Sequence, residues 1–135
     1  MAARYLLDTD ICIYIQRERP PAVLHRFRKL KAGSLAISTI TWGELCFGAE
    51  QSNQRAAVSA ALEDFISLVP VLPLPAASGR TYGVVRAALA SHGTPIGNND
   101  LWIAAHALAD RLVLVTNNER EFRRVPRLKV ENWVA

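Results

Sequence analysis

Five short apolar runs are separated by longer segments whose apolar residues recur at helical spacing. We expect the runs to be strands, and they cover residues 4–7, 35–38, 69–75, 112–115 and 128–130. The third run contains Pro70, Pro73 and Pro75, and we expect it at or near a sheet edge because proline cannot donate to a strand ladder. The intervening helices are predicted after residue 10, over 22–31, through 44 to about 50, from about 54, over 76–91 and over 98–110.

Strands that alternate with helices favour right-handed crossovers and a parallel sheet covered on both faces. We therefore predict a three-layer α/β/α fold with a central parallel sheet of four to five strands. The chain has 135 residues, of which 50% are hydrophobic and 21% charged, and it shows no linker or repeat. We treat residues 1–135 as one domain with a core of its own.

Cysteine content and the apolar pattern predict the compartment. Cys12 and Cys46 lie in apolar, helical segments, so we expect buried free thiols and a reducing, cytoplasmic setting. No apolar stretch is long enough to span a membrane, and Asp8 interrupts any signal-peptide core. We expect neither export nor membrane insertion.

Three carboxylates, Asp8, Glu44 and Asp100, occupy the same kind of position, where an apolar run or a turn meets the start of a helix. Ligands of open parallel sheets bind beyond the carboxyl ends of the strands, so these acids can converge after folding. Crowded carboxylates raise each other's pKa unless a cation compensates them. Because Mg²⁺ and Mn²⁺ prefer oxygen ligands, the pattern predicts a hard-metal site.

Each acid also has a purely structural interpretation. Asp8 belongs to an Asp-Thr-Asp sequence that can satisfy its own backbone in a turn. Glu44 stands fourth in a capping-box pattern that begins at Thr41. Asp100 would complement the helix dipole if Asn98 were the cap. If the three acids had only capping or turn roles, their shared position at such junctions would be a coincidence.

A fourth polar cluster follows the run at 112–115. It contains Thr116, Asn118, Glu119 and Glu121. Asn118 could hold water or a cation, and either glutamate could supply charge. The alternative is the solvated start of a helix.

Four segments in this order resemble the PIN-domain ribonucleases, and among them the VapC toxins of type II toxin–antitoxin systems. They are residues 6–11 (LLDTDI), 38–45 (STITWGEL), 95–107 (PIGNNDLWIAAHA) and 116–122 (TNNEREF). The resemblance implies a PIN-like fold, Mg²⁺-dependent cleavage of RNA such as tRNA or another structured RNA, a cognate VapB-like antitoxin and a homodimer. The family's acids carry over to Asp8, Glu44 and Asp100. Many members have aspartate at the position of Asn118, and the resemblance points to Glu121 as the partial replacement.

We assign roles on this basis as hypotheses. Asp8 and Asp100 hold the metal, Glu44 orients or deprotonates the attacking water, and Glu121 with Asn118 supports a second cation. Thr9 and Thr116 position these ligands.

The net charge is +4, which makes contact with a polyanion plausible. Candidate RNA contacts are Arg17, Arg19, Arg120, Arg123 and Arg124. For any one of them, a solvated helix face is the simpler interpretation. Trp42 and Trp102 could stack on bases, but we favour core positions, and we interpret His106 as a packing histidine.

Two other functions remain open. Asp8-Thr9-Asp10 also resembles the nucleophile motif of haloacid-dehalogenase-type phosphatases, although that chemistry expects a supporting lysine and a late acidic pair. The altered fourth acid leaves room for an RNA-binding or partner-binding module that has lost catalysis.

Overall fold

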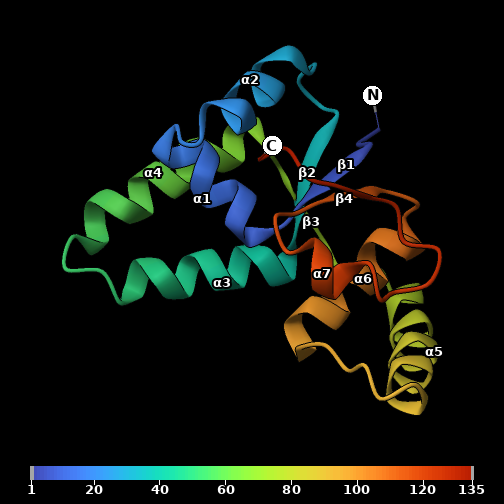
Figure 1. Ribbon diagram of the computed structural model, residues 1–135. Coiled ribbons are helices and arrows are strands. Elements are labelled where there is room, and N and C mark those ends of the chain that lie inside the picture. The colour runs from blue at the N-terminus through green and yellow to red at the C-terminus, as the bar shows by residue number, and fades with distance from the viewer. Residues whose placement is uncertain (1, 135) are drawn as a thin grey trace.

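A parallel five-stranded sheet forms the centre of the computed structural model, which describes residues 2–134 (Figure 1). The strand order is β3-β2-β1-β4-β5. The strands are β1 (Tyr5–Leu7), β2 (Leu35–Ser38), β3 (Val71–Leu72), β4 (Val113–Val115) and β5 (Val130–Glu131). The predicted fold class and strand number are confirmed. The proline-containing run forms an edge strand as expected, while β5 begins two residues later than predicted.

Seven helices cover the two faces of this sheet. They are α1 (Thr9–Arg17), α2 (Pro21–Lys29), α3 (Thr39–Glu50), α4 (Arg55–Leu68), α5 (Ala77–Ser91), α6 (Asn98–Ala109) and α7 (Glu119–Phe122). Helices α1 to α4 lie on one side of the strands and α5 to α7 on the other (Figure 1). None of the helices within residues 2–134 is long and apolar enough to cross a lipid bilayer.

Alternation along β1 links the two halves of the core. Tyr5 and Leu7 pack with the residues of α1 to α4, whereas Leu6 between them packs with the residues of α5 to α7. All three side chains are at most 5% exposed. A strand that is covered on both faces is therefore apolar throughout, which explains why its run is continuous in the sequence.

The direction of the strand order reverses at β1. The chain leaves β1 toward β2 on one side, and β4 later returns to pair with β1 on the other side. Open parallel sheets bind ligands at such a reversal, beyond the carboxyl ends of the strands. Asp8 directly follows β1 and Thr116 directly follows β4, so both lie at this point.

Helix α3 begins earlier than a capping box at Thr41 would require, so that interpretation of Glu44 is wrong. The N-cap is Ser38, whose hydroxyl accepts a hydrogen bond from the Ile40 amide at 3.2 Å. The same hydroxyl lies 2.9 Å from Nδ1 of fully buried His106. His106 is a packing histidine, as predicted, and burial lowers its pKa. Glu44 is thereby left free for contacts outside its own helix.

Candidate active site

Asp8 is fixed at the end of β1 by contacts with two elements. It caps α1 by accepting a hydrogen bond from the Thr9 amide at 2.8 Å on Oδ1. The buried hydroxyl of Thr116 donates to Oδ2 at 2.8 Å. Asp8 is only 6% exposed, so both carboxylate oxygens are positioned by the β1–β4 pairing below them.

Glu44 extends from α3 toward α1 and α6. The hydroxyl of Thr9 donates to its Oε1 at 2.6 Å, and the amide of Asn99 donates to its Oε2 at 3.4 Å. The predicted positioning contact of Thr9 is therefore made to Glu44, while Thr116 makes the matching contact to Asp8. These bonds join three helices through a single carboxylate.

Asp100 and Glu121 form the opposite side of the site. Asp100 lies in the first turn of α6, where Gly97 is the N-cap in place of the predicted Asn98. The Gly97 amide donates to Oε1 of Glu121 at 2.8 Å. Glu121 also neighbours Asp100, and this proximity raises the pKa of Asp100 while lowering that of Glu121.

Burial, reinforced by charge repulsion, raises the pKa values of two of these acids. Burial and the Asp10 carboxylate raise the pKa of Asp8 from 3.8 to about 7. Burial, Asp8 and Glu121 raise the pKa of Asp100 from 3.8 to about 7. Glu44 adds a smaller contribution to both shifts, so the four acids lie within one electrostatic cluster.

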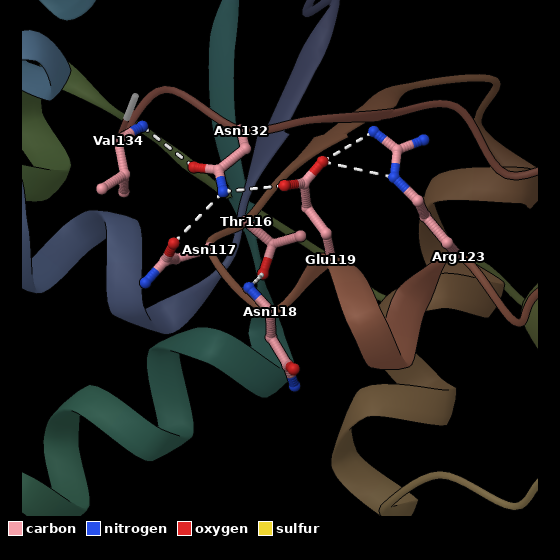
Figure 2. A network of polar contacts seen from close by, with 7 residues as sticks. All are labelled: Thr116, Asn117, Asn118, Glu119, Arg123, Asn132 and Val134. Atoms are coloured by element: carbon pink, nitrogen blue, oxygen red, sulfur yellow. Dashed lines mark hydrogen bonds and ion pairs between the residues drawn. The ribbon is translucent and has the colours of Figure 1, made fainter.

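The glutamate in this cluster is Glu121 and not Glu119. Asn118 donates to Oε2 of Glu121 at 2.7 Å. Burial alone would raise the pKa of Glu121, but the bonds from Gly97, Asn118 and Asp100 hold this pKa below its usual value. Glu119 faces the other way, toward Arg123 and Asn132, and Asn132 also reaches Asn117 (Figure 2).

Asp10 is an acid of this region that the sequence assigned only to a turn. Its Oδ2 accepts a hydrogen bond from the Asn117 amide at 3.1 Å, and its buried Oδ1 has no partner among the described residues. Burial raises the pKa of Asp10. The available sequence signal for Asp10 was the Asp8-Thr9-Asp10 motif, with two aspartates one residue apart. This spacing alone does not distinguish a turn residue from a second charged group of the site.

The donor set suits a hard cation. Asp8 is buried and Glu44 half-buried, and their carboxylate oxygens are held by hydroxyl, amide and backbone donors. No lysine or arginine within residues 2–134 hydrogen-bonds to Asp8, Glu44 or Asp100. No three acidic, histidine or cysteine side chains in the described part of the chain form a preassembled metal cage. Mg²⁺ retains several waters and is bound through one or two carboxylates, so such a cage is not required.

The predicted RNA-binding arginines fall into two groups. Arg123 is paired with Glu119 at 2.7 Å, and Arg124 donates to the Pro95 carbonyl at 2.9 Å. Arg17, Arg19 and Arg120 are exposed, and their side chains form no hydrogen bond within residues 2–134. The second group is therefore the freer to meet a phosphate.

Both candidate stacking tryptophans have protein partners. Trp42 packs against the core between β1 and α4. Trp102 stacks on Tyr82, with ring centroids 3.9 Å apart and planes 17° from parallel. The expected core packing is confirmed for Trp42, whereas Trp102 is half-buried and belongs to neither core cluster of the described residues.

Comparison with known proteins finds relatives in the family that the sequence resembles. Residues 5–128 match the model of the PIN domain. The chain is 44% identical over 131 residues to ribonuclease VapC2 of Haemophilus influenzae. This match covers 97% of this chain and 98% of the relative. It is 42% identical over 130 residues to the tRNA(fMet)-specific endonuclease VapC of Shigella flexneri, covering 96% and 98%.

Solved structures agree over the same extent. The DNA-bound VapBC complex of Salmonella typhimurium superposes with a TM-score of 0.90 at 40% identity, covering 97% of this chain and 98% of that chain. The DNA-bound VapBC2 complex of Rickettsia felis superposes with a TM-score of 0.89 at 38% identity, covering 96% and 98%. The phosphatase resemblance at Asp8 is thus superseded by one that spans the chain. This chain belongs to the PIN-domain family, in its VapC branch.

Proposed function

We propose that this chain is the toxin of a type II toxin–antitoxin system and cleaves RNA phosphodiester bonds with Mg²⁺, or Mn²⁺ in its place. The observation that carries the proposal is the cluster formed by buried Asp8 and half-buried Glu44 and Asp100, none of which hydrogen-bonds to a lysine or arginine within residues 2–134, in a chain of the VapC branch. Such a cluster is costly to bury and becomes favourable when a cation enters.

Asp8 and Asp100 would hold the metal, directly or through water. Their raised pKa values reflect burial first and neighbouring negative charge second, and no lysine or arginine within residues 2–134 hydrogen-bonds to either group, so they gain most from a cation. When bound, Mg²⁺ would supply positive charge against the phosphate and lower the pKa of the attacking water.

The chain's own residues position the water and the phosphate. Glu44 accepts the proton of the attacking water as the new oxygen–phosphorus bond forms, and the leaving ribose oxygen takes a proton from solvent as its bond to phosphorus breaks. Thr9 holds the Glu44 carboxylate in place through its 2.6 Å hydrogen bond. Glu121, oriented by Asn118 and Gly97, holds Asp100 and supports a second, weaker cation.

The substrate class follows from charge and from the relatives. The net charge is +4, and exposed Arg17, Arg19 and Arg120 can contact phosphates around the acidic site. The Shigella flexneri relative is named as an endonuclease specific for tRNA(fMet), which makes tRNA or another structured RNA the first substrate to test.

The partner proposal rests on the neighbouring structures. The Salmonella and Rickettsia structures are VapBC complexes bound to DNA. We expect a VapB-like antitoxin to inhibit this chain in the cytoplasm, and a homodimer of the toxin within the complex.

Asp100→Asn should abolish cleavage of bulk tRNA in Mg²⁺ while preserving the circular dichroism spectrum, because the amide cannot supply the charge that binds the cation. EDTA should abolish wild-type cleavage, and excess Mg²⁺ should restore it. Asp64→Asn, at an exposed position of α4, is the matched control. Full activity of Asp100→Asn would refute the assignment, and EDTA-resistant cleavage would refute the metal.

Glu121→Gln should raise the Mg²⁺ concentration needed for half-maximal cleavage by about 10- to 100-fold, the range for residues that orient metal ligands. Glu119→Gln is the control on the same helix, because its carboxylate faces Arg123 and Asn132. Equal Mg²⁺ requirements for the two variants would contradict the role of Glu121.

The metal-free protein should become less stable as pH rises from about 4 to about 7. In this interval folded Asp8 and Asp100 retain protons that the unfolded chain has released, since both folded pKa values are raised from 3.8 to about 7. In EDTA near pH 8, Asp8→Asn should therefore raise Tm by at least about 3 °C. The measurement is thermal unfolding against pH. An unchanged or lower Tm for Asp8→Asn, with Asp64→Asn as reference, would show that burial of the Asp8 charge is not destabilising.

A further inference from the structure

An open groove of about 620 Å³ adjoins the carboxylate cluster. Its walls are the first turns of α3 and one residue of α6: Thr39, Ile40, Gly43, Glu44, Phe47 and Asn99. Glu44 belongs both to this groove and to the site of cleavage. Whatever occupies the groove therefore lies beside the reacting phosphate.

Phe47 is the unexplained residue of this groove. Its side chain is 62% exposed, although it lies one helical turn after Glu44 on a helix that is otherwise packed through Leu45 and Ala49. Trp42 packs against a core cluster and Trp102 stacks on Tyr82, whereas Phe47 is in neither core cluster and in no aromatic pair of the described residues. A large aromatic ring in water at the edge of an active site suits a ligand with a flat apolar face.

We propose that Phe47 stacks on a nucleobase next to the scissile phosphate and so positions the RNA for cleavage. This inference rests on the proposed function, because it assumes that RNA is the substrate. It assigns to the groove a task that the carboxylates cannot perform, namely holding the base while the acids act on the backbone.

The chemistry of the walls favours a base over a phosphate. No lysine or arginine lines the groove, and the Glu44 carboxylate repels an anion there. The Oδ1 atom of Asn99 can accept a hydrogen bond from a base edge, while its amide is directed to Glu44. An aromatic ring with one amide beside it is a common way to hold an unstacked RNA base.

Gly43 offers a way to test the groove without touching the carboxylates. A Cβ added at Gly43 would meet no atom within 4 Å, and the same is true of Gly48 on the same helix. Only Gly43 lines the groove. Leucine at either position is a better helix former than glycine, so neither variant should lose stability. Gly43→Leu fills the groove, and Gly48→Leu is its matched control.

The experiment uses a synthetic RNA that carries the cleavage site mapped in bulk tRNA, and the same RNA with an abasic nucleotide on either side of the scissile bond. Phe47→Ala should lower kcat/KM on the intact RNA roughly tenfold or more, and Phe47→Trp should restore it. One abasic RNA should impose a similar loss on wild type and no further loss on Phe47→Ala. Gly43→Leu should cleave as poorly as Phe47→Ala, with Tm unchanged or raised, while Gly48→Leu should cleave like wild type.

Two results would overturn the inference while leaving the proposed function intact. One is cleavage by Phe47→Ala at the wild-type rate. The other is a full abasic penalty that persists in Phe47→Ala. If Phe47→Ala cleaves normally but escapes inhibition by the antitoxin, the groove binds a protein and not a base. If wild type itself cleaves no RNA while Asp100→Asn is equally inactive, the proposed function fails and this inference fails with it.

Discussion

The structure depends on holding several carboxylates close together without a neutralising side chain. Three of the four acids are anchored by neutral donors: Thr116 for Asp8, Thr9 for Glu44, and Gly97 with Asn118 for Glu121. An arginine or lysine in any of these places would remove the repulsion and also occupy the space of a cation. Hydroxyl, amide and backbone donors fix the oxygens and leave their negative charge available.

This arrangement opposes stability, so the rest of the fold must offset it. Because folding raises the pKa values of Asp8 and Asp100 from 3.8 to about 7, their ionised forms destabilise the fold in the absence of a cation. The offset comes from the two apolar layers on either side of β1, where Leu6 and Leu7 are fully buried in opposite clusters. Both layers meet at the strand that ends in Asp8, which makes the site rigid where the repulsion is greatest.

Sequence patterns correctly predict the residues of this site that lie at strand ends. They do not predict which way a side chain on a helix points. Continuous apolar runs located β1 and β4, and therefore the convergence of Asp8 with Thr116. The capping-box motif misled because Ser38, three residues before Thr41, already caps α3. Glu119 and Glu121 could not be separated, since their distinction depends on which side of a four-residue helix faces α6. Phe47 carried no signal, because an apolar residue on a helix suggests a core position.

The exchange of an expected aspartate for Asn118 changes how charge is divided in the site. Asn118 cannot supply a negative charge, but its amide donates to Glu121 and helps hold the pKa of that carboxyl down. Burial and the charges of Asp8 and Glu121 instead raise the pKa of Asp100. The pKa values of these neighbouring acids thus move in opposite directions, because neutral donors favour the ionised form of Glu121 while burial and like charges favour the protonated form of Asp100. Asn118 therefore supports a carboxylate on α7 where many family members have an aspartate, and under the proposed function Glu121 supplies the charge that Asn118 lacks.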